Sequence, residues 1–209
     1  MPPPPPWSAP DPLPDRLETP RLVLRYWRPE DAPAMLVAID VDRAGLVRWM
    51  PWPEIDNRNA AECVFNIERF RRGRENKSEP PASYSIGIFD RVSGEAVGGT
   101  GLHRIDFAIG QAEIGYWIRA DRHRQGLCTE AIEGLVGWAF TPQARGGWGL
   151  RRIVVVCAEP NVASRGVPEK LGLRRELHAK KDRWLEGVGW VDSLGYGVDA
   201  DEWASRRVT

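Results

Sequence analysis

The sequence predicts an α/β fold in which helices flank one mixed β-sheet. Two observations carry this prediction. Residues 84–120 contain three consecutive segments of strand-like alternation, which favours an antiparallel arrangement. Residues 127–171 then read as a helix, a continuous apolar strand and a second helix. The predicted order of elements is β, α, α, three β, α, β, α and two β. We therefore expect one mixed sheet, with both antiparallel and parallel strand neighbours, in a fold of α+β type.

Composition indicates an ordinary soluble domain, because the 209 residues are 42% hydrophobic and 28% charged. The formal net charge is 0, and basic residues cluster in one loop only, which argues against nucleic acid or an acidic membrane as a partner. The three cysteines form no C-x-x-C pair and indicate reduced thiols without a zinc site. No signal pattern and no membrane-length apolar run is present, so we expect a cytoplasmic protein.

The first 14 residues contain eight prolines, which predicts an extended polyproline-II arm. We expect residues 1–17 to be a disordered, solvated arm and residues 18–209 to form one domain. Order is expected to begin near Thr19.

The remaining elements follow from hydrophobic period and from turn and cap residues. Strands are predicted over Arg21–Trp27, within SYSIGIF and AVGGTGLHRI as a hairpin, within QAEIGYWIRA, and within LRRELHAKKDRWL and GWVDSLGYGV at the end of the chain. Helices are predicted after Pro29, within Asn57–Arg74, after Gly126, and from Asn161 to Leu171, where Gly172 ends the helix. The continuous apolar centre of LRRIVVVCA predicts a strand covered on both faces.

The stretch DRHRQGLCTEA joins a predicted strand to a predicted helix through a basic loop with one glycine. N–H groups at a helix N-terminus lack intrahelical partners and carry partial positive charge. A pyrophosphate fits such a site where a glycine lets the backbone come close. Arg122 and Arg124 add attraction for an anion, and Thr129 is placed to cap the helix or to reach a phosphate oxygen.

This loop resembles the acyl-CoA pyrophosphate loop of the GNAT acyltransferase superfamily, whose motif is Gln/Arg-x-x-Gly-x-Gly/Ala. Here the motif reads HRQGLC, with His123 and Cys128 departing from it. ETPRLVLRYWRPEDA, AEIGYWI, PNVAS…EKLGL and GWVDSLGYGVDADEW resemble segments of the RimJ/RimL branch, the ribosomal-protein alanine acetyltransferases, in the same chain order. The resemblance covers roughly Glu18–Trp203.

The resemblance implies a mostly antiparallel twisted sheet whose middle strands splay apart. It also implies acetyl transfer from acetyl-CoA, the co-substrate, to a primary amine by direct attack in a ternary complex. The acceptor would be a peptide N-terminus or a small-molecule amine. Alternatives are a succinyl- or other acyl-CoA donor, or a non-catalytic acyl-CoA-binding regulator. No metal, nucleic acid or membrane is expected, and the chain would be a monomer or a homodimer.

Cofactor contacts are implied by the same resemblance. Backbone groups of Trp117, Ile118 and Arg119 would hold pantetheine like an added strand, unless Trp117 and Ile118 simply pair with LRRIVVVCA. Asn161 would bind the pantetheine arm, or serve only as a helix N-cap. The loop residues implied to bind the pyrophosphate are His123, Arg124, Gln125, Gly126, Leu127, Cys128 and Thr129.

Acyl transfer needs a neutral amine and a donor to the departing sulfur. By resemblance, Ser164 would donate to the thiolate, unless it bonds back to a helix carbonyl. Glu113 is the first candidate for the base, and the alternative is that it faces solvent or pairs with one of the 25 arginines. His103 is the competing base, because its unperturbed pKa suits the task; His178 and His123 have weaker claims.

Two further features bear on the site. RWMPWPE places Trp49 and Trp52 between helices, where they would line the acceptor pocket or else serve core packing or a dimer contact. His103 is also a candidate to line that pocket. Pro168 lies inside the predicted helix with Ser164, and it removes the N–H that would bond the Ser164 carbonyl. We therefore expect the helix to kink or to start late, and either outcome bears on where the Ser164 hydroxyl points.

Overall fold

One mixed sheet runs through the molecule. The computed structural model describes residues 5–76, 81 and 83–206, and within them eight strands pair in the order β1-β2-β3-β4-β5-β6-β8-β7. All neighbours are antiparallel except β5 and β6, which are parallel. The mixed sheet predicted from the sequence is thus confirmed. The strands are β1 (Arg16–Glu18), β2 (Leu22–Tyr26), β3 (Tyr84–Asp90), β4 (Ala96–Asp106), β5 (Gln111–Ile118), β6 (Arg152–Ala158), β7 (Arg174–Leu185) and β8 (Gly189–Asp199).

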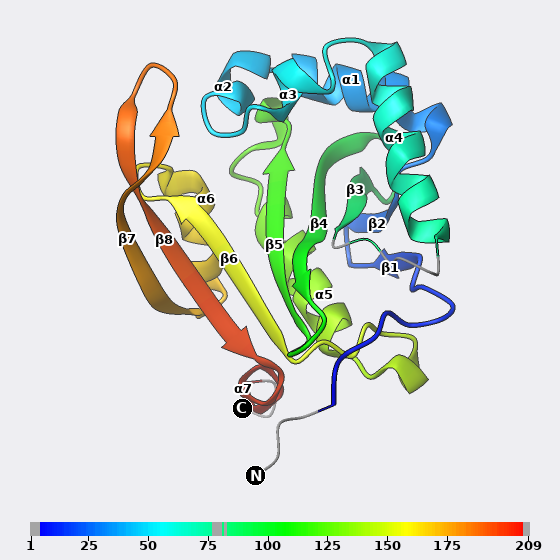
Figure 1. Ribbon diagram of the computed structural model, residues 1–209. Coiled ribbons are helices and arrows are strands. Elements are labelled where there is room, and N and C mark those ends of the chain that lie inside the picture. The colour runs from blue at the N-terminus through cyan, green and yellow to red at the C-terminus, as the bar shows by residue number, and fades with distance from the viewer. Residues whose placement is uncertain (1–4, 77–80, 82, 207–209) are drawn as a thin grey trace.

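The helices lie in two groups. In Figure 1, α1 to α4 gather at one end of the sheet, and α5 and α6 lie along its other side. The long helices follow the predicted segments, whereas the short α2 and α3, like β1, were not predicted. The helices are α1 (Ala32–Asp40), α2 (Arg43–Val47), α3 (Trp52–Ile55), α4 (Ala60–Glu75), α5 (Leu127–Phe140), α6 (Val162–Lys170) and α7 (Ala200–Ser205), with short 3-10 turns at Pro29–Asp31, Ala120–Arg122 and Gln143–Arg145. Among the described residues, no helix has the length and apolar character of a membrane span.

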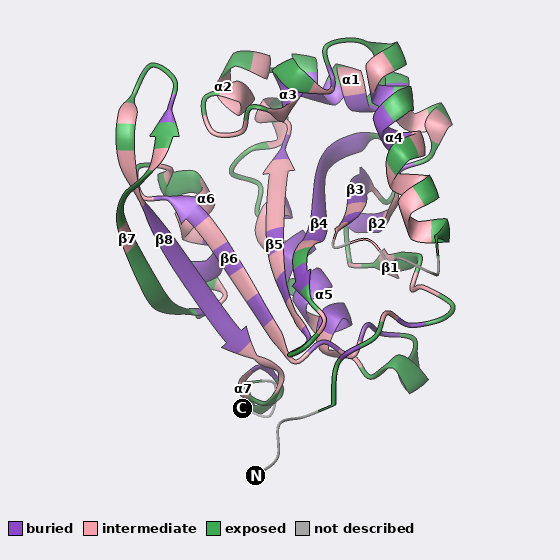
Figure 2. Ribbon diagram, viewed as in Figure 1, coloured by how far each residue is buried: buried purple, intermediate pink, exposed green. Residues whose placement is uncertain are grey.

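Each face of the sheet carries its own core, because strand side chains alternate between faces. In β5, Ala112, Ile114 and Ile118 pack with α5 in the larger core. Trp117 packs against the smaller core between the sheet, α1 and α4. Figure 2 shows the buried stripe on α5 and β8, and the exposed edge strand β7. The middle strands therefore present different side chains to two separate helical layers.

The prediction that LRRIVVVCA is covered on both faces is wrong. In β6, Ile153, Val155 and Cys157 are buried, whereas Val154 and Val156 are half-exposed. The helices α1 and α4 pack against β4 and β3 instead, so the second face of β6 is only partly shielded. Apolar β-branched residues on both faces do not require burial on both.

The expectation of a solvated arm over residues 1–17 does not hold at Trp7. Trp7 is 5% exposed and packs on Phe107, with ring centroids 5.6 Å apart. Its indole N–H donates to the Trp148 carbonyl at 3.0 Å, and its backbone N–H donates to the Phe107 carbonyl. Burial of one large aromatic side chain is enough to hold a polar, proline-rich segment against the domain. Residues 1–4 lie outside the described part.

Candidate active site

The parallel strands β5 and β6 separate part-way along their length. Their pairing covers Gln111 to Glu113 on β5 and ends there, as expected for splayed strands. The Arg119 N–H donates to the Val97 carbonyl on the β4 side at 2.9 Å. Because hydrogen-bonding direction alternates along a strand, the backbone groups of Tyr116 and Ile118 face the gap. Those of Trp117 and Arg119, which the sequence assigned to this role, face β4 instead.

The loop before α5 has the conformation of an anion site. Arg124 and Gly126 both have positive φ, 59° and 77° respectively. Gly126 is the N-cap of α5 and offers no side chain to its first N–H groups. Within the described chain, no hydrogen bond uses the N–H groups of residues 124–129. Six backbone donors are thus left at a helix N-terminus, where an anion is stabilised.

Two of the three arginines in and next to this loop form ion pairs, and among the described residues the third, Arg124, does not. Arg119 binds Asp121 through two nitrogens, at 2.7 and 2.9 Å, and Arg122 binds Glu95 at 2.9 Å. Arg124 is exposed and makes no ion pair with any described residue. It is therefore the loop cation with the most freedom to meet a phosphate.

The remaining loop residues split between support and surface. The His123 ring donates from Nε2 to the Ile118 carbonyl at 2.7 Å, which engages one of the gap-facing strand groups. Gln125 accepts from Arg21 through its carbonyl. Leu127 is buried in the larger core, and Thr129 is half-buried in the first turn of α5. Burial raises the pKa of the Cys128 thiol to about 12, so it stays protonated at neutral pH.

The helix α6 begins beside the gap. The Asn161 side chain accepts from the Ser164 N–H at 3.1 Å, so the N-cap interpretation of Asn161 is confirmed. The Ser164 hydroxyl points toward the Tyr116 phenol, with 3.4 Å between oxygens. Tyr116 lies on β5 beyond the last pair of the two strands. The Ser164 hydroxyl therefore lies at the gap itself.

A pocket opens on the other face of β4 and β5, beneath α3 and α4; we call it the tryptophan pocket. Its volume is about 270 Å³. Its walls are mainly aromatic and apolar, with polar groups at the floor and rim. The apolar lining includes Trp27, Met35, Met50, Trp52, Phe70 and Trp117, and the polar lining includes Asp56, Asn57, Asn66, Thr100 and His103.

His103 is the basic group of this pocket. Its imidazole lies against the glycine face of the strands, since a Cβ added at Gly101 or Gly115 would be 2.8 or 3.6 Å from its Nε2. No hydrogen bond from a described residue engages its ring nitrogens. Burial lowers the pKa of His103, and the positive charge of Arg104 lowers it further. The ring is therefore neutral at pH 7 and can accept a proton.

Glu113, the first candidate base, lies outside the tryptophan pocket and is bound to an arginine. It is directly across from His103 on the neighbouring strand, and its carboxylate accepts from Arg104 at 2.9 Å. It is not among the residues that line the tryptophan pocket. The structure thus agrees with the alternative that Glu113 pairs with an arginine. Arg104 reaches Glu113 from an irregular stretch of β4, where its own φ is 47°.

The two tryptophans of RWMPWPE have different places. Trp52 lines the tryptophan pocket and packs on Trp117, with ring centroids 5.6 Å apart. Trp49 is not part of the lining, and the Arg48 guanidinium lies 5.1 Å from its ring centre. Trp49 is thus not a lining residue of this pocket, which leaves core packing or a dimer contact as the alternatives for its ring. The short helix α3 begins at Trp52, whereas Trp49 lies before it.

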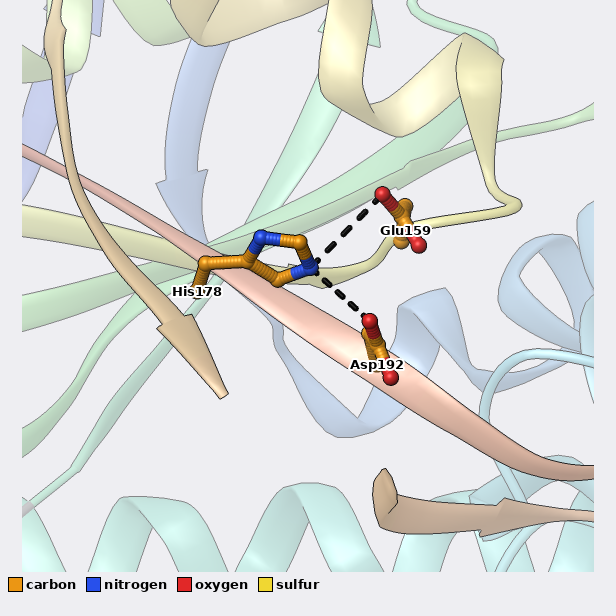
Figure 3. A group of neighbouring side chains, drawn as sticks. All are labelled: Glu159, His178 and Asp192. Atoms are coloured by element: carbon orange, nitrogen blue, oxygen red, sulfur yellow. Dashed lines mark hydrogen bonds and ion pairs between the residues drawn. The ribbon is translucent and has the colours of Figure 1, made fainter. Parts of the chain in front are cut away.

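His178, a weaker candidate base, lies away from the pocket in a charged group on the sheet surface. Its Nε2 is 2.8 Å from Asp192 and 3.7 Å from Glu159 (Figure 3). These three side chains come close enough together to ligate a metal ion. The Lys180 ammonium is 2.7 Å from Asp192 and 3.0 Å from His178, so a cationic side chain already balances the carboxylates.

Comparison with known proteins identifies the family to which this fold belongs. A family model described as "Acetyltransferase (GNAT) domain" matches residues 21–174. The chain is a GNAT acetyltransferase. The family predicted from the sequence is thereby confirmed, and so is N-acetyl transfer as the class of enzyme.

Relatives of this GNAT acetyltransferase include "Putative ribosomal N-acetyltransferase YdaF" of Bacillus subtilis, which is 27% identical over 188 residues and covers 89% of this chain and 95% of that protein. A solved structure of RimL, a ribosomal L7/L12 alpha-N-protein acetyltransferase in complex with coenzyme A, shares the fold with a TM-score of 0.77, 20% identity, and 90% and 99% of the two chains covered. Microcin C7 self immunity acetyltransferase MccE, in complex with acetyl-CoA and AMP, superposes with a TM-score of 0.73, 23% identity, and 87% and 93% covered.

Proposed function

We propose that this chain transfers the acetyl group of acetyl-CoA to a primary amine by direct attack within a ternary complex. The observation that carries the proposal is the gap between β5 and β6. On one side it meets a helix N-terminus with unused N–H groups, and on the other it meets a pocket that holds a neutral imidazole. The complexes of RimL with coenzyme A and of MccE with acetyl-CoA support the same donor.

The donor would lie across the sheet. The pyrophosphate would take the N–H groups of residues 124–129, with Arg124 as the mobile cation. The pantetheine arm would follow the gap-facing backbone of Tyr116 and the Ile118 N–H, because strand groups without a partner need one. The Ile118 carbonyl already has a partner in the His123 ring. The arm would then reach the start of α6, where the Asn161 carboxamide is already fixed as the N-cap of the helix.

The acceptor would enter through the tryptophan pocket. Its nitrogen attacks the thioester carbonyl carbon, so that the C–N bond forms as the C–S bond breaks. His103 takes the proton lost by the amine, and the Ser164 hydroxyl donates a hydrogen bond to the leaving thiolate. We prefer His103 to Glu113 as the base, because His103 lines the pocket while Glu113 is held by Arg104.

The walls of the pocket bear on the choice of acceptor. Aromatic rings and methionine side chains favour an amine that carries an apolar or aromatic group. Both a protein N-terminus with such a residue and a small aromatic amine meet this description. A volume of about 270 Å³ leaves room for one or two residues of a peptide, but not for a folded partner.

A thiol-release assay that crosses acyl donors with acceptors tests this function. Acetyl-CoA should be consumed in the presence of amines or N-terminal peptides with an apolar group near the amine, and the acetylated product should be visible by mass spectrometry. Succinyl-CoA as the better donor would correct the acyl group only. Tight binding of acetyl-CoA with no turnover on any acceptor would instead favour a non-catalytic acyl-CoA-binding regulator.

Gly126→Val should weaken CoA binding at least tenfold by calorimetry. The backbone at Gly126 has a φ of 77°, which a β-branched residue adopts only with strain, so the loop would leave the conformation that presents its N–H groups. Steric overlap is not the reason, because a Cβ there would meet its nearest neighbour, Arg21, at 3.5 Å.

The matched control for this variant is Gly146→Val. Gly146 has a similar φ of 78°, and a Cβ there has no neighbour within 4 Å. It carries the same backbone strain in a loop far along the chain from the α5 N-terminus, so CoA affinity should be unchanged. Equal affinity losses in both variants, or none in Gly126→Val, would remove the α5 N-terminus from the cofactor site.

A further inference from the structure

The carbonyl group of Ser164 lacks its normal helical donor. In an α-helix this carbonyl accepts from the N–H four residues on, and here that residue is Pro168, which has no N–H. Yet α6 continues through Pro168 to Lys170, and both Ser164 and Pro168 are shielded from solvent at least in part. A shielded carbonyl without a donor is costly, so the chain must supply one from elsewhere.

That donor is Tyr116, which is 48 residues away in sequence. Its phenol O–H donates to the Ser164 carbonyl at 2.8 Å. Tyr116 lies on β5 beyond the last pair with β6, so this hydrogen bond crosses from the splayed strand to the helix. It connects the two elements between which the donor thioester would have to pass.

We propose that Tyr116 is a positioning residue that replaces the missing Pro168 N–H and thereby holds Ser164 at the gap between β5 and β6. The kinetic part of this inference rests on the proposed function, whereas the hydrogen-bond replacement stands on its own geometry. An internal proline weakens the helix α6, and the missing partner weakens the end of β5. The Tyr116 side chain connects these two weak points through one hydrogen bond.

The arrangement also assigns the hydroxyl protons. The Tyr116 proton is committed to the Ser164 carbonyl, so the phenol oxygen is left as an acceptor for the Ser164 hydroxyl at 3.4 Å. Burial raises the pKa of Tyr116 well above its usual range, which keeps this proton in place. Tyr116 therefore orients Ser164 and does not itself protonate the leaving thiolate. The longer Ser164–Tyr116 contact is weak enough for the serine hydroxyl to turn toward a sulfur.

A double-mutant cycle on Tyr116 and Pro168 tests the proposal. Tyr116→Phe should lower kcat about tenfold and lower the urea midpoint of unfolding, because it leaves the Ser164 carbonyl without a donor. Pro168→Ala restores the backbone N–H. In that background, Tyr116→Phe should change kcat less than about threefold and should leave the urea midpoint nearly unchanged. The affinity for acetyl-CoA should stay near wild type in every variant that folds.

Tyr196→Phe is the matched control, because Tyr196 also donates to α6 but to the Glu169 side chain, at 2.8 Å. Its effect should add to that of Pro168→Ala without coupling. An effect of Tyr116→Phe that is equal in the wild-type and Pro168→Ala backgrounds would overturn the proposal. If Tyr116→Phe alone does not fold, folding of the double variant supports it and failure of the double variant overturns it. If the wild-type chain acetylates no amine, the proposed function fails, but the unfolding cycle still decides whether Tyr116 replaces the proline N–H.

Discussion

His103→Gln should lower kcat about 10²-fold while the affinity for acetyl-CoA stays near wild type. Glutamine keeps the size and polarity of the side chain but cannot accept a proton from the amine. Acceptors with weakly basic nitrogens should suffer less, because they arrive already neutral. The measurement is steady-state kinetics with amines of graded basicity, together with calorimetry of acetyl-CoA binding.

The pH dependence identifies the base more sharply than the size of the loss. A base must be neutral, so the rate should fall on the acid side as His103 gains a proton, below the usual histidine pKa of about 6.5. Arg104→Ala removes a positive charge that lowers the pKa of His103, so the acid limb should move to higher pH. In His103→Gln that limb should vanish. If Glu113→Gln abolishes the limb and His103→Gln keeps it, Glu113 is the base.

The conformation of the loop before α5, which we propose as the pyrophosphate site, could be predicted from sequence because its signals are local. The glycine, the basic residues and the following helix lie within a dozen residues, and backbone sterics at Gly126 determine the loop wherever it occurs. The Asn161 N-cap is equally local, since it bonds the Ser164 N–H three residues on. The strand alternation of β3 to β5 predicted the sheet for the same reason.

The acceptor side could not be predicted in the same way, because it depends on contacts between distant segments. Whether Trp49 or Trp52 points inward depends on the short helix α3, which has no hydrophobic period of its own. The pairing of Glu113 with Arg104 depends on a strand irregularity with a non-glycine residue at positive φ. The burial of Trp7 depends on the Phe107 and Trp148 regions of the chain. Composition alone gave the opposite expectation for that segment.

The sequence shows that Pro168 deprives the Ser164 carbonyl of its helical donor, but it does not show which group replaces that donor. A proline inside a helix implied a kink and an unpaired Ser164 carbonyl. The structure keeps the helix and brings in a phenol from β5. From the sequence alone, any side-chain hydroxyl or N–H group of the chain could be this donor. The position of Tyr116 on the splayed strand is visible only once the strands are placed.

Ser164→Ala should lower kcat about 10- to 100-fold, at or below the low end of what one donor to developing charge is worth. Alanine is the best helix former, and it keeps the backbone carbonyl that Tyr116 binds, so neither the stability of α6 nor the affinity for acetyl-CoA should fall. The loss should therefore appear in kcat alone.

Asn161→Ala supplies the contrast to this variant. It removes the N-cap bond to the Ser164 N–H and should cost about 1 kcal/mol of stability. A loss of kcat in Ser164→Ala without any loss of stability cannot then be ascribed to fraying of the helix. A CoA-bound crystal structure should place the Ser164 hydroxyl within about 4 Å of the sulfur. A longer distance together with wild-type kcat in Ser164→Ala would leave this serine with no part in expelling the thiolate, and Tyr116 would then serve α6 only as a structural donor.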